Sequence, residues 1–173
     1  MSFKEISIKN FNANPMTMLS DGWLLLTAGD EANGFNTMTV SWGHLGAIWG
    51  NSGGMPSVAV YIRPHRYTKE FVDRNDRFTL SALGPEHRKA LEYLGSASGR
   101  DGDKVSKAGL TPVFDQHTTY FSEAKLVLIC RKLYHAPIRE DGFVDKSIVD
   151  ANYPAKDFHE MYIGEIISIL AKD

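Results

Sequence analysis

Residues 23–42 read WLLLTAGDEANGFNTMTVSW, and this stretch carries the clearest fold signal in the chain. The apolar run over residues 23–29 is typical of a buried strand, and residues 30–34 are strong turn formers. Residues 36–41 then predict the return strand, because Thr and Val favour extended backbone. The stretch therefore predicts an antiparallel β-hairpin.

Apolar runs and turn residues predict the other elements in the same way. The remaining predicted strands cover residues 57–62, 77–83, 125–134 and 161–170. A short helix is expected after Thr68, an acceptable N-cap, and an amphipathic helix is expected from Pro85 to about Leu94, closed by Gly95. The first half of the strand 125–134 is apolar on both faces, which indicates a closed or doubly covered sheet.

The connections between these strands indicate the fold class. They are mostly hairpins or single short helices, without the regular βαβ alternation that builds a parallel doubly wound sheet. The Gly-rich stretch 43–54 is too short and too aromatic for a linker, and we expect an ordered loop there. We therefore predict a mainly β protein, an antiparallel barrel with a few short helices outside it, formed by a single domain over residues 1–173.

Size and composition are those of an ordinary globular domain. The chain has 173 residues, 43% of them hydrophobic, and 19 basic against 21 acidic residues give a net charge of −2. We expect no nucleic-acid partner, because such proteins carry a basic excess or stripe. No apolar run approaches the roughly 20 residues of a membrane span, and residues 1–9 lack the apolar centre of a secretory leader. We expect a cytoplasmic location and no membrane association.

Several familiar motifs are absent from the sequence. It contains no G-x-G-x-x-G turn, no phosphate-binding P-loop and no G-x-S-x-G elbow. The single cysteine, Cys130, excludes a disulfide framework within the chain and is expected to be a small core residue. The six histidines are scattered without the spacing of a zinc protease, so no metal site is expected.

A first polar cluster follows the hairpin turn. It consists of Asn36, Thr37, Met38, Thr39, Val40, Ser41 and Trp42. Backbone N–H groups and hydroxyls at a strand end can bind a flat heteroaromatic ligand, and the Trp42 ring can flank it. A plain β-hairpin explains the same residues, because Thr and Val favour strands.

A second, basic cluster directly precedes the helix expected after Thr68. It consists of Arg63, Pro64, His65, Arg66, Tyr67, Thr68 and Lys69. A helix N-terminus offers free N–H groups and the positive end of a dipole, so two arginines and a hydroxyl beside it predict a phosphate site. A solvated basic turn that pairs with Glu70 or Asp73 accounts for these residues equally well.

Two further clusters lie later in the chain. The third consists of Ser98, Gly99, Arg100, Asp101, Gly102, Asp103 and Lys104. It forms a tight loop in which Arg100 and Lys104 can reach an anion or a ring carbonyl, although a polar linker between two helices has the same composition. The fourth begins at His159, before the last strand. This histidine can orient a substrate or shuttle a proton, and it can equally be a half-exposed surface residue.

In their order and spacing, the four clusters resemble the flavin reductase-like family of the FMN-binding split barrel. The resemblance covers residues 23–170 and implies a six-stranded antiparallel Greek-key barrel that works as a homodimer, with one FMN per subunit near the dimer interface. It implies that Asn36 and residues 37–42 line the flavin ring and ribityl chain, and that His159 lies near the approach of the nicotinamide. It implies phosphate contacts from Arg63, Arg66, Tyr67 and Thr68, and a covering loop of Ser98, Gly99, Arg100 and Asp101 with Lys104.

The resemblance also implies an activity. Because the cofactor carries the hydride chemistry, few acid or base side chains are needed. NADH or NADPH is expected to reduce FMN, which passes electrons to a second flavin, a partner oxygenase or another acceptor. Trp42 replaces the Ser or Thr of many relatives and narrows the space for a second flavin or a nicotinamide. Two alternatives remain: an FMN-binding electron carrier without its own nicotinamide site, and the same barrel with haem or a small aromatic ligand.

Overall fold

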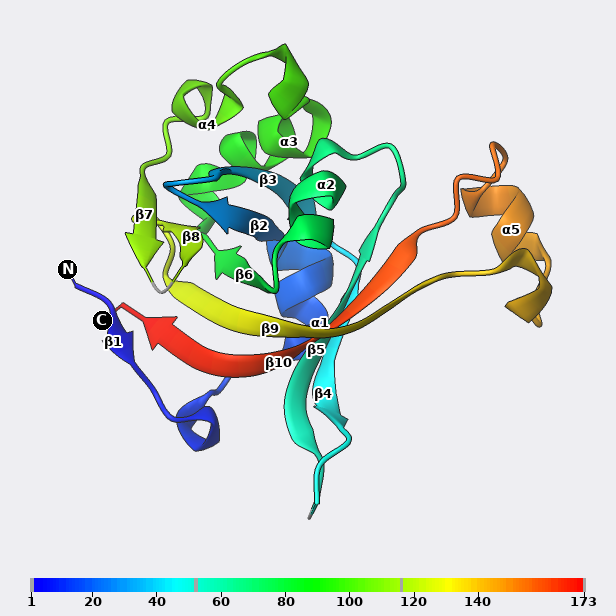
Figure 1. The fold of residues 1–173 in the computed structure, drawn as a ribbon, viewed down its shortest axis with the longest axis horizontal. Helices are drawn as coiled ribbons and strands as arrows, with labels where there is room; N and C mark the ends of the chain where they lie inside the picture. Colours follow the sequence, from blue (N-terminus) through cyan, green and yellow to red (C-terminus); the bar gives the residue numbers. More distant parts are fainter. Residues whose placement is uncertain (1, 52, 116, 173) are drawn as a thin grey trace.

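The hairpin predicted from residues 23–42 is confirmed and begins the main sheet (Figure 1). The structure is a computed structural model that describes residues 2–51, 53–115 and 117–172. In it, β2 (Leu24–Asp30) pairs antiparallel with β3 (Gly34–Val40) along its whole length. The Asp30 carboxylate closes the turn by accepting a hydrogen bond from the Asn33 backbone N–H at 2.8 Å.

The described residues form one eight-stranded antiparallel sheet and one smaller sheet. The strand order is β3-β2-β6-β9-β10-β5-β4, with β1 added beside β10. Its other strands are β1 (Lys4–Glu5), β4 (Gly43–Ile48), β5 (Met55–Ile62), β6 (Arg77–Ala82), β9 (Leu126–Pro137) and β10 (Glu160–Ala171). The smaller sheet consists of β7 (Pro112–Asp115) and β8 (Thr118–Phe121).

Short helices surround the sheet. They are η1 (Ile8–Asn10), α1 (Pro15–Thr17), η2 (Met18–Gly22), α2 (Tyr67–Arg74), η3 (Pro85–His87), α3 (Arg88–Ser96), η4 (Gly99–Asp101), α4 (Lys104–Lys107), η5 (Glu140–Gly142) and α5 (Ser147–Asn152). Figure 1 shows α2, α3 and α4 gathered on one side of the molecule, and α5 far from them on an extension between β9 and β10. Within the described part of the chain, no helix combines the length and apolarity that a membrane crossing requires.

The strands share one main core. Buried side chains of β2, β3, β5, β6, β9 and β10 belong to it, together with Phe71 and Val72 of α2. Along β9, Leu128 and Cys130 face this core, while Val127 and Ile129 pack in a second cluster. The prediction that this strand is covered on both faces is therefore confirmed, as is the core position of Cys130. Burial raises the pKa of the Cys130 thiol.

The predicted class, a mainly antiparallel β fold with a few short helices, is confirmed, although the strand count differs from the expected six. One cause is the stretch 43–54, where the expectation of a loop is wrong: β4 occupies its first half and pairs with β5. Glycine disfavours strands, which hides β4 in the sequence. Gly43 is needed there, because a Cβ would lie 2.8 Å from the Ala59 carbonyl oxygen. Ser52, in the same stretch, lies outside the described residues.

Two predicted helix boundaries are also wrong. Helix α2 has Arg66 at its N-cap, while Thr68 lies inside the first turn. The second helix divides into η3 and α3, and Gly95 lies within α3 instead of closing it. A Cβ at Gly95 would lie 3.4 Å from the Cβ of Thr39, an ordinary van der Waals contact, so Gly95 lies against β3 but packing there does not require a glycine.

Candidate functional site

Two joined hollows lie along β3. The first, which we call the wide hollow, has a volume of about 490 Å³ and is lined by Met38, Thr39, Val40, Ser41, Trp42, Tyr61, Arg63, His65, Arg66, Asp157 and His159. Within the described residues, β3 pairs with β2 alone, so its outer edge presents backbone N–H and C=O groups. A flat ligand in the wide hollow therefore meets hydrogen-bonding backbone on one side.

The second hollow, which we call the cationic hollow, has a volume of about 280 Å³ and continues past Met38, His65 and Arg66. It is also lined by Asn36, Tyr67, Thr68, Ser96, Ala97, Ser98 and Lys104. The amide Nδ2 of Asn36 donates to the Thr68 hydroxyl at 2.8 Å, which joins β3 to the first turn of α2. The two hollows form one elongated site whose far end is basic.

The basic end has one buried cation, Lys104, and one partly buried cation, Arg66. The Lys104 residue is only 5% exposed, and its Nζ donates to the Ala97 carbonyl at 3.0 Å and the Leu94 carbonyl at 3.5 Å. The guanidinium of Arg66 donates to the Gly95 carbonyl. Among the described residues, neither cation has a carboxylate within ion-pair distance. In the part of the chain that the structure describes, both side chains donate to neutral carbonyls at the end of α3.

This lack of counter-charge is energetically costly. Burial, with added repulsion from Arg66, lowers the pKa of Lys104 to about 8. Burial likewise lowers the pKa of Arg66. The negative end of the α3 dipole offsets part of the cost. Arg66 has five N–H donors and Lys104 has three, so both retain donors for a further acceptor. An anion in the cationic hollow would supply the missing charge.

The other end of the site is aromatic. His159 is 8% exposed, and its Nδ1 shares a 2.9 Å hydrogen bond with the Tyr153 hydroxyl. Its ring centre lies 4.9 Å from that of Trp42. Burial, with a smaller contribution from Arg63, lowers the pKa of His159 to about 4. The imidazole is therefore neutral near pH 7 and acts as a polar aromatic wall.

Comparison with known proteins agrees with this architecture. Residues 16–173 match the family model described as "Flavin reductase like domain". The chain belongs to the flavin reductase-like family. No curated protein matches it significantly.

Solved structures of the same fold include an FMN-binding domain of a flavin reductases-like enzyme from Shewanella baltica OS155, at 14% identity and a TM-score of 0.66, covering 98% of this chain and 77% of that chain. Flavoredoxin of Desulfovibrio vulgaris (Miyazaki F) has 22% identity and a TM-score of 0.64, and the match covers 87% of this chain and 69% of flavoredoxin. An NADH:FAD oxidoreductase from Streptomyces globisporus C-1027 has 16% identity and a TM-score of 0.61, and the match covers 87% of this chain and 75% of the oxidoreductase. At these identities the likeness shows the fold alone, a flavin reductase-like split barrel.

The structure separates the two arginines that the family resemblance assigns to one phosphate. Arg63 forms an ion pair with Asp157 at 2.6 Å and donates to the Asn152 carbonyl at 2.9 Å. It lines the wide hollow near His159 and not the cationic hollow. A phosphate role for Arg63 therefore stays a prediction, and the geometry favours Arg66 with Lys104 instead.

Four predicted flavin contacts line neither hollow: Thr37, Gly99, Arg100 and Asp101. The Thr37 hydroxyl is fully buried and donates to the Leu26 carbonyl at 3.2 Å, so its side chain serves the hairpin. Arg100 pairs with Glu70, and its guanidinium carbon lies 4.5 Å from the centre of the Tyr67 ring. Asp101 is exposed in η4. Contacts of these residues with the flavin remain predictions that the geometry does not favour.

Gly99 packs tightly behind the site. A Cβ at this position would overlap the Asn36 amide, so glycine lets η4 approach β3 closely. The neighbouring Ser98 hydroxyl accepts a hydrogen bond from the Arg100 backbone N–H at 3.2 Å and lines the cationic hollow. The third sequence cluster therefore reaches the site through Ser98 and Lys104.

Sequence reasoning missed two wall residues of the wide hollow, Tyr61 and Asp157, and two of the cationic hollow, Ser96 and Ala97. Tyr61 stands at the end of β5, two positions before Arg63, so extending the second cluster backwards would have found it. Asp157 had no local signal, because its position depends on the Arg63 ion pair, which joins segments far apart in the chain.

Proposed function

We propose that this chain is an FMN-dependent oxidoreductase that takes a hydride from NADH or NADPH and passes electrons to a flavin or another acceptor, such as a partner oxygenase. The carrying observation is the pair of cations formed by the buried Lys104 and the partly buried Arg66, which lacks a carboxylate partner among the described residues. The phosphate group of FMN has the charge and the acceptor oxygens that this pair requires. Membership of the flavin reductase-like family supports the same ligand.

The residues of the cationic hollow suit a phosphate in detail. The Thr68 and Ser98 hydroxyls each accept a hydrogen bond within the protein, at 2.8 and 3.2 Å, so each keeps its own proton to donate. Arg66 and Lys104 add charged donors on either side. Four donors around one hollow would bind an anion through charge-assisted and neutral hydrogen bonds.

The wide hollow suits a flat ring. The edge of β3 offers backbone groups, and Trp42 and His159 supply aromatic faces on which a ring can pack. FMN, when bound, supplies the hydride-accepting and electron-transferring chemistry. The protein itself binds, orients and shields the ring from water, which explains why a catalytic triad is not needed.

His159 is the candidate residue at the nicotinamide approach. The hydrogen bond from or to the Tyr153 hydroxyl holds its ring, and the low pKa of His159 keeps it uncharged. A neutral imidazole beside the cleft can donate or accept one hydrogen bond from a carboxamide without adding charge. We assign it a role in orienting the reductant.

We also propose that the protein is a cytoplasmic homodimer. Three large apolar side chains at the end of β4 and in β9 are exposed. Ile48 is 38% exposed, Trp49 is 49% exposed and Tyr134 is 45% exposed. The rings of Trp49 and Tyr134 lie 6.4 Å apart and form a shared aromatic surface. A second copy packed on this surface would remove it from water.

One observation favours the alternative of an electron carrier without its own nicotinamide site. The indole of Trp42 stands 4.9 Å from the His159 ring and lines the wide hollow on the side that we assign to the nicotinamide, so it would narrow that approach. In that case the flavin would receive electrons from a protein or another reductant.

An absorbance spectrum of the purified protein, recorded without air before and after NADH and then NADPH, separates these functions. A yellow protein that bleaches supports the reductase. A yellow protein that stays oxidised with both nucleotides supports the carrier. A colourless protein that also fails to bind added FMN refutes the proposal and favours a different ligand in the same barrel.

A further inference from the structure

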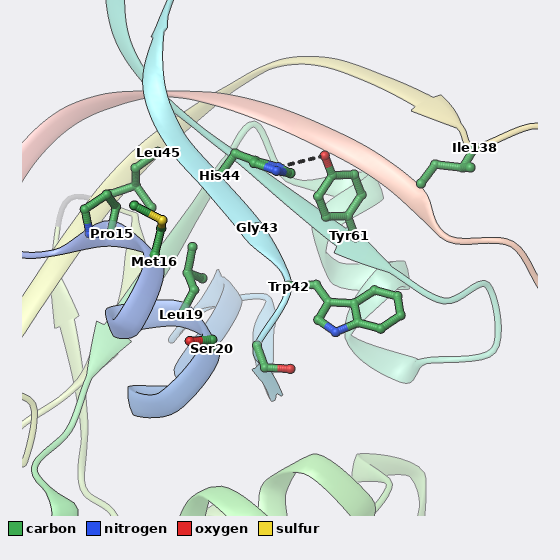
Figure 2. Close-up of a pocket in the computed structure, with 11 residues that line it drawn as sticks. Pro15, Met16, Leu19, Ser20, Trp42, Gly43, His44, Leu45, Tyr61 and Ile138 are labelled. Atoms are coloured by element: carbon green, nitrogen blue, oxygen red, sulfur yellow. Dashed lines mark hydrogen bonds between the residues drawn. The ribbon is translucent and has the colours of Figure 1, made fainter. Parts of the chain in front are cut away.

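A third hollow adjoins the wide hollow and has a different chemistry. This apolar pocket has a volume of about 440 Å³ and lies between α1 with η2 on one side and the start of β4 on the other (Figure 2). It shares Ser41, Trp42 and Tyr61 with the wide hollow. The two hollows therefore have a common wall, and a molecule in the pocket would lie beside the hollow that we propose for the flavin ring.

The walls of the apolar pocket favour an uncharged ligand. Met16, Leu19 and Leu45 lie on one side in Figure 2, and Ile138 lies on the opposite side. None of the eleven residues that line the apolar pocket is an Asp, Glu, Lys or Arg. The phosphates of a nicotinamide nucleotide or of free FMN would find no counter-charge here, and desolvating them would be costly. The volume is within the usual range for a small organic ligand.

The pocket wall also offers a hydrogen-bond donor. His44 Nδ1 and the Tyr61 hydroxyl are 3.0 Å apart (Figure 2). If Tyr61 donates to Nδ1, the His44 Nε2–H is left over; if Nδ1–H donates to Tyr61, the phenolic proton is left over. Either tautomer leaves one donor in this pair. A neutral ring that carries an acceptor oxygen matches this wall.

We propose that the apolar pocket binds a neutral quinone of one or two rings as the electron acceptor. The inference rests on the proposed function, which supplies the reductant. The overall step converts NAD(P)H, a proton and the quinone into NAD(P)⁺ and the hydroquinone. Two electrons and one proton come from the nicotinamide by way of the flavin, and water supplies the second proton. The alternative acceptor, a second flavin nucleotide, carries phosphate charge that this pocket does not match.

Binding of menadione, a two-ring quinone, tests the pocket without any flavin. Met16 is 75% exposed and lines the pocket, so Met16→Asp places a carboxylate there without disturbing the core. Equilibrium dialysis of the purified protein should show menadione binding that Met16→Asp weakens about tenfold or more, because an apolar ring would pack against a charge. Val144→Asp is the matched control, since Val144 is fully exposed and lines none of these three hollows. A second variant, Ser20→Trp, fills the pocket and should have the same effect as Met16→Asp.

Kinetics provide the second readout. With NADH in excess, Met16→Asp and Ser20→Trp should raise KM for menadione about tenfold and leave the rate with ferricyanide, a small acceptor that needs no apolar pocket, unchanged. Absence of menadione binding in dialysis, or equal affinity in Met16→Asp and Val144→Asp, overturns the proposal. If the proposed function is wrong, FMN does not bind or NADH does not reduce it. Dialysis still measures menadione binding to the apolar pocket in that case, so the two failures are distinguishable.

Discussion

Replacing Lys104 by Met isolates the charge on which the flavin assignment rests. The side chains have similar length, so Lys104→Met removes the ammonium group and retains most of the packing. A charge-assisted hydrogen bond contributes about 1.5–3 kcal/mol, which corresponds to FMN binding weakened by about 10- to 150-fold. Lys107→Met is the matched control, because Lys107 lies in the same helix, α4, and is exposed.

Although Lys104→Met should weaken FMN binding, it should not lower the folding stability of the flavin-free protein. Lys104 is 5% exposed, and among the described residues its ammonium has the Leu94 and Ala97 carbonyls as its hydrogen-bond partners. Removing an uncompensated buried charge relieves its desolvation cost, so the free energy of unfolding of the flavin-free protein should stay level or rise. Flavin fluorescence titration and urea unfolding measure the two effects.

The affinity should also depend on pH. In the free protein the pKa of Lys104 is lowered to about 8, and a bound phosphate would raise it. Binding then takes up a proton, so affinity weakens as pH rises through that pKa. The charged fraction falls about tenfold between pH 7 and pH 9, and the FMN Kd should rise by about the same factor. Lys104→Met should lose this dependence, and Lys107→Met should keep it.

Two results would refute this reasoning. Equal FMN affinity of Lys104→Met and Lys107→Met would show that the amine does not contact the phosphate. A loss of more than about 2 kcal/mol of unfolding free energy in Lys104→Met would show that the amine is mainly a cap for the α3 carbonyls.

Other predictions concern the remaining site residues and the assembly. Arg66→Ala should weaken FMN binding by about 1–3 kcal/mol in a titration. Arg100→Ala should change FMN affinity little, because Arg100 already pairs with Glu70. A larger loss of FMN affinity in Arg100→Ala than in Arg66→Ala would contradict the assignment. His159 has a pKa lowered from 6.5 to about 4, so the unfolded chain binds more protons and stability should fall on acidification between these values. In urea unfolding at pH 7 and pH 5, His159→Gln should show a smaller fall than the natural protein, and an equal fall would count against a buried neutral imidazole. Light scattering at micromolar concentration should give a dimer mass, reduced by Trp49→Asp; a monomer mass for the natural protein would exclude the dimer.

Local patterns in the sequence were sufficient for most of the framework. Turn residues between Asp30 and Gly34 and the apolar run before them predicted the β2–β3 hairpin. The two-faced apolar pattern of β9 predicted a strand between two packed layers, and the structure confirms it. Such signals are readable because side-chain alternation and turn conformation depend only on neighbours in the chain. The strand β4 was not predicted because glycine disfavours strands, and the close approach of Gly43 to Ala59 of β5 is visible only in the structure.

The site was less predictable than the framework. Thr37 and Arg100 stand in the right sequence clusters, yet one serves the hairpin and the other pairs with Glu70. Membership of a cluster says that residues are near in sequence, whereas contact with a ligand depends on which way each side chain points. That direction is decided by strand pairing and by packing between elements.

Local patterns and motifs in the chain were enough to predict an antiparallel β domain of the flavin reductase-like family and the residue types of its site. How those residues are combined depends on the folded arrangement. It placed Lys104 with Arg66 in the cationic hollow, moved Arg63 to an ion pair with Asp157, and set Trp42 against His159. These arrangements join segments that are far apart along the chain, and they arise from long-range strand pairing and helix packing, which local propensities do not specify.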